Sequence, residues 1–535
     1  MASENVVIQE ATPLHESMIW DLQNQFYINK GPACWTEAIV PQFITSNSYI
    51  AYQYANCILG YINDYYSRPD AKKDKPIYIV EVGAGHGKLG FLILNHLEEL
   101  AEFMPEGVPK PYLYVISDFT QNIVDFCKSH KRMAEHINRG VVDFAVFDCE
   151  KDSEFSLQIS GAKLSSETVE TPVIAIANYV FNGLREQSIS INNGIVSEGC
   201  IKILADPNVS ATDIDIISRM KLEWSYKPIP DVDAHFQDPV LHDLVHQSDF
   251  WNSINPSYLQ NNETLNVLLP LGALRFIRTL ESLSRGQFLL ITADKAHAHE
   301  EDLRLTKENP HIAIHGSFSM MANFHALRQV FLSRGGASFH TPYYTGLQVA
   351  AFALGETPLE EFQFAWENVL LAFDPDSFSQ LQRCIRDETP SPSLKNILAL
   401  IRLSRFESEV FYKFKQVLVD HIPYASDRLQ SDFKSDILHI AANFYPLSAS
   451  KDVDFDLGRL SMGLRDYETS IRLFKKSIEL CGEHYVTWHN LGICYYYMDD
   501  LKESMNSFNR CLEIQPEYQD AKSWRARVEE KLNAK

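Results

Sequence analysis

The chain has 535 residues, of which 45% are hydrophobic and 22% charged, and its formal net charge is −22. These proportions are typical of globular proteins, and the length predicts two to four domains. The acidic balance, with no Lys/Arg-rich run, argues against binding to nucleic acid or to anionic membranes, since both need a positive surface. Nine scattered cysteines without a Cys-x-x-Cys pair predict reduced thiols in a cytoplasmic protein. No leader pattern or membrane-spanning apolar run is visible, which predicts a soluble protein.

Residues 77–94 predict a strand, a glycine-rich turn and the start of a helix. In the turn, Glu81 is followed by Gly83, Gly85 and Gly87. Glycine adopts positive φ angles and lets the backbone approach a ligand, while the N-terminus of the following helix offers free N–H groups. The turn therefore predicts a binding site in which these four residues take part. A P-loop is excluded, because Val82 stands where that motif needs glycine.

Three further apolar segments each end in polar residues. Continuous apolar runs are typical of buried parallel strands, and ligands bind at the carboxyl ends of such strands in open α/β sheets. The segments and their polar residues are 111–118 ending at Asp118, 141–147 followed by Asp148, and 172–177 followed by Asn178 and Tyr179. We therefore expect these four side chains to lie with the glycine turn at one edge of a sheet.

The acidic residue and alternating glycines resemble motif I of class I S-adenosylmethionine (SAM) methyltransferases. The resemblance implies that Glu81 holds the methionine amine through the glycine loop, that Asp118 binds the ribose and that Asp148 contacts the adenine. Asn178 and Tyr179 would border the reacting methyl group. The segment from Gly85 to Gly90 also fits the Gly-x-Gly-x-x-Gly pattern of nicotinamide-dependent enzymes. That alternative is disfavoured by Glu81 and by the predicted antiparallel end of the sheet.

The remainder of the sheet is predicted after a long insertion. Residues 186–262 begin with a hairpin at Asn193-Gly194 and are rich in aromatic residues, proline and histidine. The later elements are a helix over 271–285, a strand over 287–292, a helix around 322–333 and a terminal antiparallel pair over 337–341 and 347–354. His315 precedes the last helix and is a candidate base at neutral pH. His297 and His299 are interpreted as a solvated loop rather than as metal ligands.

Part of this pattern resembles the MidA-type methyltransferases, which include enzymes that modify arginine. The glycine turn with Leu89, residues 43–47 as a cofactor-lid segment, and Asn178 fit that family. Tyr179 and Asn182 stand where the family has Glu and Asp. An arginine acceptor needs a carboxylate partner, so arginine methylation is not expected here.

Residues 451–484 and 485–518 are two copies of a 34-residue unit, the period of the tetratricopeptide repeat (TPR). The second copy resembles the TPR pattern closely, with Trp488, Leu491, Gly492, Tyr495, Ser504, Phe508 and Pro516 at keyed positions. Residues 519–533 predict a capping helix, and 356–450 predict helices that complete the array. The resemblance implies a groove for a protein partner; an internal scaffold or a homodimer is the alternative use of this surface. Phe455 and Arg459 replace the residues of a chaperone-binding carboxylate clamp, so that partner is not expected.

The sequence thus predicts an α/β Rossmann-like class I methyltransferase sheet followed by an all-α TPR solenoid. The predicted parts are an N-terminal helical and lid segment (1–75), a methyltransferase domain (76–355) and a helical TPR-like domain (356–535). The first functional hypothesis is a SAM-dependent methyltransferase whose TPR module recruits a protein acceptor. The second is a catalytically inactive SAM-binding adaptor. The acceptor could be a protein nitrogen, a carboxylate or a small molecule, and the sequence leaves these alternatives open.

Overall fold

The computed structural model describes residues 5–40, 43–213, 215–254, 263–342, 346–389, 392–448 and 450–534. Contacts between residues divide the chain into two compact units. The first comprises Met1–Ser46 and Gln53–Ser377, and the second comprises Asn47–Tyr52 and Phe378–Lys535. The domain boundaries at 75/76 and 355/356 stay predictions.

The first unit is built on a seven-stranded sheet with the order β17-β18-β12-β7-β2-β3-β4. Its strands are β2 (Ile77–Glu81), β3 (Tyr112–Asp118), β4 (Val142–Val146), β7 (Val173–Asn178), β12 (Phe288–Asp294), β17 (Ala337–His340) and β18 (Gln348–Leu354). The strands from β4 to β12 are parallel, whereas β18 runs antiparallel to both β12 and β17. Counted in chain order from β2, the sheet reads 3-2-1-4-5-7-6, which is the strand order of the class I methyltransferase fold. The predicted fold class and its antiparallel end are confirmed.

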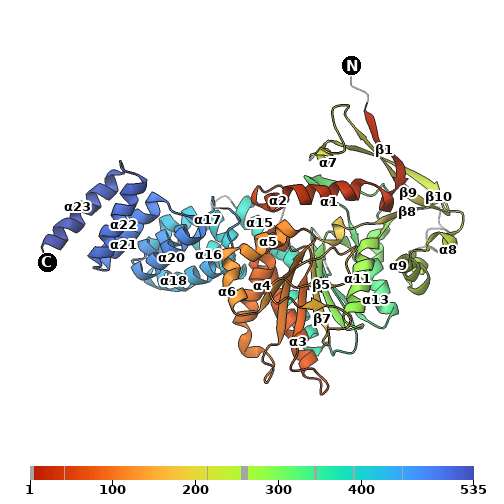
Figure 1. Ribbon diagram of the computed structural model, residues 1–535, viewed down its shortest axis with the longest axis horizontal. Coiled ribbons are helices and arrows are strands. Elements are labelled where there is room, and N and C mark those ends of the chain that lie inside the picture. The colour runs from red at the N-terminus through yellow and green to blue at the C-terminus, as the bar shows by residue number, and fades with distance from the viewer. Residues whose placement is uncertain are drawn as a thin grey trace. The chain divides into compact units, whose positions relative to one another are not determined.

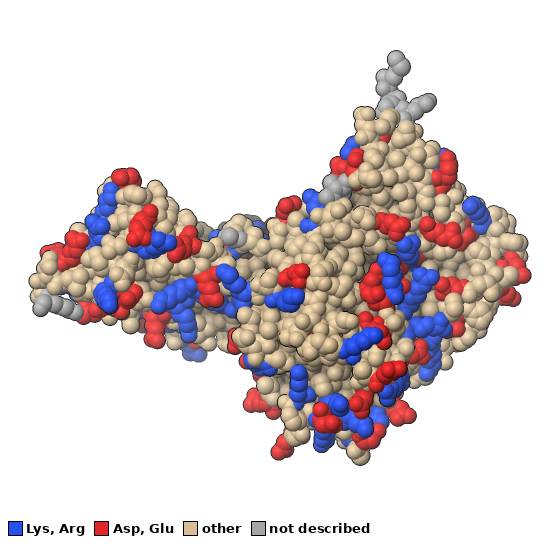
Figure 2. All heavy atoms as spheres, in the orientation of Figure 1, with Lys and Arg blue, Asp and Glu red and all other residues tan. Residues whose placement is uncertain are grey.

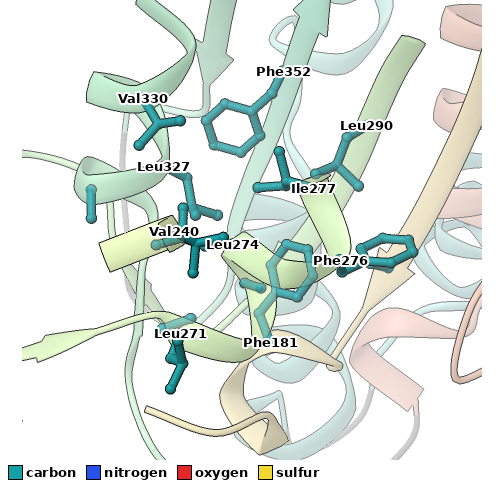
Figure 3. Close-up of a cluster of buried hydrophobic side chains, with 14 of the residues drawn as sticks. Phe181, Val240, Leu271, Leu274, Phe276, Ile277, Leu290, Leu327, Val330 and Phe352 are labelled. Atoms are coloured by element: carbon teal, nitrogen blue, oxygen red, sulfur yellow. The ribbon is translucent and has the colours of Figure 1, made fainter. Parts of the chain in front are cut away.

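Helices cover both faces of this sheet. Figure 1 shows α4 (Lys88–Glu99) and α5 (Gln121–Ser129) on one side, and α11 (Leu271–Leu283) and α13 (Phe324–Ser333) on the other. Figure 3 shows how the second face is filled: Leu274 and Ile277 of α11 lie with Val330 of α13 against Leu290 of β12 and Phe352 of β18. These side chains are at most 4% exposed, so this face of the sheet packs against a buried hydrophobic core.

A second sheet is built largely from the predicted insertion. Its strands are β1 (Val6–Pro13), β8 (Gln187–Asn192), β9 (Ile195–Ala205), β10 (Lys221–Pro228) and β11 (Thr264–Leu269). The hairpin at Asn193-Gly194 is confirmed, with φ angles of 47° and 80° that suit a two-residue turn. Strand β1 was not expected, because the N-terminal segment was predicted to be helical; it pairs antiparallel with β9. The helices α1 (Ile19–Lys30), α2 (Ala33–Thr36) and α3 (Ser48–Tyr66) follow it.

The second unit is helical. Its helices include α16 (Leu394–Leu403), α17 (Ser408–His421), α18 (Asp427–Ala442), α19 (Val453–Gly463), α20 (Tyr467–Cys481), α21 (Tyr485–Tyr497), α22 (Leu501–Ile514) and α23 (Gln519–Asn533). The helix pairs α19/α20 and α21/α22 coincide with the two predicted repeats. A β-carbon added to Gly492 would lie 2.7 Å from the Phe508 ring, and one added to Gly458 would lie 2.7 Å from the Phe474 ring. Glycine is therefore what lets the two helices of each repeat approach this closely.

Other short elements connect these parts. They are α6 (Ala134–Asn138), α7 (Ile216–Arg219), α8 (Val232–His235), α9 (Pro239–His242), α12 (Glu300–Leu303), α14 (Glu360–Ala365), α15 (Pro375–Arg383), β5 (Phe155–Ser156), β6 (Lys163–Leu164), β13 (Ala296–His297), β14 (Ala313–His315), β15 (Ser317–Ser319) and β16 (Ala322–Asn323). The face drawn in Figure 2 carries positive and negative side chains intermixed. Within the described ranges, no helix has both the length and the apolar composition needed to cross a bilayer.

Candidate functional site

A pocket lies in the first unit, where β2, β3, β4 and β7 end. Its wall contains seven of the nine predicted site residues: Gly83, Gly85, Asp118, Asp148, Asn178, Tyr179 and His315. Glu81 and Gly87 are not among its lining residues. The expected gathering of polar strand ends at one edge of the sheet is therefore present. His315, which was expected in a loop, ends strand β14 of the β14–β15 hairpin and adds to this wall.

The glycine turn forms the floor of the pocket. Gly83, Gly85 and Gly87 have φ angles of 60°, 56° and 75°, a region that side chains disfavour. The Ala84 amide donates to the Ser117 carbonyl at 2.9 Å, which fastens the turn to β3. Gly87 is the N-cap of α4. The turn has the conformation that the alternating glycines predict.

Asp118 ends β3 and is 4% exposed. Its carboxylate accepts hydrogen bonds from the Gly85 amide at 3.2 Å, from the Thr120 amide at 3.2 Å and from the Thr120 hydroxyl at 3.4 Å. Burial outweighs these bonds and raises the pKa of Asp118 to about 6. One carboxylate thus joins the glycine turn to the end of β3 and still faces the pocket.

Glu81 points away from the pocket. Its carboxyl group accepts a hydrogen bond from the Tyr114 hydroxyl at 2.9 Å, and Gly90 of α4 leaves the space that it fills. Burial raises the pKa of Glu81 to about 8. The Glu81 side chain therefore lies between Tyr114 of β3 and Gly90 of α4.

Asp148 lies at the pocket's edge just after β4. Its carboxylate accepts from the Glu150 amide at 2.9 Å and from the Lys151 ammonium at 2.7 Å. These bonds shape the turn over residues 148–152, so Asp148 has a structural role in addition to its place in the wall. The predicted adenine contact stays a prediction.

The end of β7 is held rigidly. The Asn178 side chain accepts from the Tyr54 hydroxyl at 2.9 Å and donates to the Thr45 carbonyl at 3.3 Å. Tyr179 follows with a φ of 53°, an unfavourable angle for a residue with a side chain. Its amide donates to the Ala293 carbonyl at 2.9 Å, which helps to fix this conformation. Strained residues of this kind often occur at functional sites.

His315 closes another side of the pocket. Its Nε2 atom lies 3.2 Å from the Ser319 hydroxyl, and its Nδ1 atom is buried without a hydrogen-bond partner among the described residues. Burial lowers the pKa of His315, so the imidazole is neutral at pH 7. A neutral imidazole with an unused nitrogen can accept a proton.

The roof of the pocket comes from residues that the sequence did not single out. Trp20, Gln23 and Tyr27 of α1 and Trp35 of α2 line it. The Gln23 amide donates to the Phe318 carbonyl at 3.2 Å, and the Trp20 ring lies 5.4 Å from the Phe318 ring. The spacing of positions 20, 23 and 27 puts these residues on one helix face. This helical spacing is the signal in the sequence that could have identified them as one surface.

The charge of the wall limits what the pocket can bind. Its described lining includes the carboxylates of Asp118, Asp148 and Glu150 and no lysine or arginine. His86 also lines it, and burial lowers the pKa of this side chain to about 3, so it adds no positive charge. Two of these carboxylates are paired with cations outside the wall, Asp148 with Lys151 and Glu150 with Arg185. Asp118 is therefore the carboxylate through which the wall favours a positively charged ligand over a pyrophosphate.

Comparisons with known proteins give a sequence match for the C-terminal repeats. Residues 486–518 match the family model of the tetratricopeptide repeat. A 65-residue stretch is 31% identical to the tetratricopeptide repeat-containing protein trd-1 of Caenorhabditis elegans; it covers 12% of this chain and 8% of that protein. The predicted second repeat is therefore confirmed.

Solved structures give more distant likenesses. A Burkholderia thailandensis protein bound to S-adenosyl-homocysteine (SAH) aligns with 64% of this chain and 88% of its own, at 10% identity and a TM-score of 0.40. The plantazolicin methyltransferase BpumL, in complex with SAH, aligns with 64% of this chain and all of its own, at 8% identity and a TM-score of 0.26. The fold assignment here depends on the strand order of the sheet. By that strand order and by the repeat match, the chain joins a class I methyltransferase fold to C-terminal tetratricopeptide repeats.

Proposed function

We propose that this protein is a SAM-dependent methyltransferase whose TPR helices recruit a protein acceptor. The observation that carries the proposal is the pocket at the carboxyl edge of a class I sheet, with three carboxylates and no lysine or arginine in its described wall. SAM carries a net positive charge, whereas NAD carries a pyrophosphate. The wall therefore supports SAM over the nicotinamide alternative.

The cofactor would lie across the glycine turn. Gly83 and Gly85 let the backbone approach it, Asp118 accepts from the ribose hydroxyls, and Asp148 binds the adenine amino group. Glu81 acts through the turn: its bond to Tyr114 fixes the position of the backbone that faces the methionine amine. The carboxylate of Asp118, which lines the pocket, also favours the positive charge of the bound molecule.

When bound, SAM supplies an electrophilic methyl group, and the contribution of the protein is mainly orientation. The side chain of Asn178, fixed by Tyr54 and Thr45, and that of Tyr179 border the methyl group. They hold the acceptor in line with it and exclude water. His315, which lines the pocket, accepts the proton that the acceptor loses.

The alternative is an adaptor that binds SAM without turnover and acts through its TPR helices. It is favoured by Tyr179 and Asn182, which replace the two acidic residues of MidA-type enzymes. In such an adaptor the TPR surface binds the partner protein or a second copy of the chain.

Calorimetric titration of the full chain with SAM, SAH and NAD tests the cofactor. Binding of SAM and SAH without NAD is expected. Binding of NAD alone, or of none of the three, would contradict the proposal. Transfer of a labelled methyl group to proteins of a cell extract then separates the enzyme from the adaptor, since the adaptor binds SAM but labels nothing.

A further inference from the structure

Trp35 lies directly on the glycine turn. A β-carbon added to Gly85 would lie 2.7, 3.1 and 3.2 Å from the Cζ2, Cη2 and Cε2 atoms of the indole. The edge of the Trp35 ring therefore occupies the space that the missing side chain leaves. Gly85 and Trp35 both line the pocket, so a ligand bound beside the turn also meets the indole.

The indole is held in place by neighbouring rings. Tyr27 stacks with it at a centroid distance of 6.3 Å and an interplanar angle of 23°. The imidazole of His86 meets it edge-on at 5.7 Å and 82°. Tyr27 in turn packs against Phe119, whose ring lies 6.3 Å away. These contacts come from α1, from the glycine turn and from the residue after β3, so the position of Trp35 is set from several sides.

A carboxylate stands beside this aromatic group. Asp118 bonds the amide of Gly85, the same glycine that Trp35 covers. The ring adjacent to Trp35 on the turn, that of His86, stays uncharged because burial lowers its pKa to about 3. An aromatic face next to a carboxylate, without a competing cation in the described wall, is the arrangement that recognises organic cations.

We propose that Trp35 is a specificity-determining residue that recognises the positive charge of the SAM sulfonium through its indole and so distinguishes SAM from SAH. The inference rests on the proposed function and extends it. Methyl transfer converts the sulfonium to an uncharged thioether, and the attraction to the indole is then lost. The product consequently binds less tightly than the substrate, which favours its release.

The test compares three ligands that differ in charge at this position. SAM has a sulfonium, SAH has a neutral thioether, and sinefungin has an amino group that is positively charged at pH 7. Dissociation constants are measured by calorimetry for the unmodified full chain and for Trp35→Leu and Trp35→Phe. Trp224→Leu is the matched control, since Trp224 lies in β10 and is not among the residues lining the pocket.

Trp35→Leu is expected to weaken SAM and sinefungin binding by about 2- to 30-fold, the range of a cation–π interaction, and to leave SAH within about 2-fold. Trp35→Phe, which keeps an aromatic face, should retain much of the SAM preference. An equal loss for all three ligands would overturn the inference in favour of stacking on the adenosine. Tighter binding of all three would overturn it by showing that the indole obstructs the site, and unchanged constants would overturn it as well. If the unmodified chain binds neither SAM nor SAH, the proposed function itself fails, which is a different result.

Discussion

Replacement of Asp118 by alanine tests the cofactor placement most directly. The carboxylate of Asp118 accepts three hydrogen bonds, two of them from the backbone amides of Gly85 and Thr120. In the proposed complex it also accepts from the ribose hydroxyls. A hydrogen bond to a charged group contributes about 1.5–3 kcal/mol, so its loss should raise the Kd for SAM by about 10- to 150-fold.

The substitution also changes the protein itself, which should raise the Kd further. Without Asp118, the Gly85 amide loses its acceptor and the glycine turn loses a link to β3, which adds to the loss of affinity. Calorimetry measures the Kd, and circular dichroism verifies that the sheet remains folded. Asp118→Asn keeps one acceptor oxygen and should give an intermediate Kd. Asp125→Ala, an exposed carboxylate on α5, is the control. A Kd for Asp118→Ala within 2-fold of the unmodified value in a folded protein would refute the placement.

Three further predictions follow from the structure. Burial raises the pKa of Asp294 from 3.8 to about 8, so the folded state keeps a proton that the unfolded state has released. The free energy of unfolding should therefore fall as pH rises from 4 to 8. Asp294→Asn should reduce this dependence on pH in denaturant titrations. His315→Gln should lower the rate of labelled methyl transfer by about 10²- to 10⁴-fold with an unchanged Kd for SAM; an unaltered rate would exclude His315 as the base. Gly492→Val should force its side chain against Phe508 and destabilise the repeats by about 1–3 kcal/mol, seen as a lower Tm, whereas Ser523→Val on the exposed side of α23 should change it little.

The parts of the site that the sequence predicted are those encoded locally. Asp118, Asp148 and Asn178 could be placed because each follows a continuous apolar run, and parallel strands end at a common edge. The glycine turn could be predicted because glycines at alternate positions mark a backbone with positive φ angles. The direction of the Glu81 side chain could not, since it depends on the hydroxyl of Tyr114, a residue of another strand.

The roof of the pocket was missed for a related reason. Trp20 and Trp35 look like ordinary core aromatics in the sequence, and only the three-dimensional position of α1 and α2 makes them part of the wall. Strand β1 was missed because its partner, β9, lies about 190 residues later. Long-range pairing leaves little trace in local patterns, whereas the 34-residue period of the repeats is visible without any structure.

The long-range anchoring of the roof has a consequence for the order of folding. Strand β1 and helix α1 are synthesised well before the residues that anchor them: β1 pairs with β9, and the Gln23 side chain of α1 donates a hydrogen bond to the Phe318 carbonyl, 295 positions later. Closing loops of this length costs conformational entropy that local contacts do not. We therefore expect nascent chains that end before residue 317 to lack the roof. In such chains β1 and α1 should stay sensitive to proteolysis, and the pocket would form only once most of the first unit has emerged.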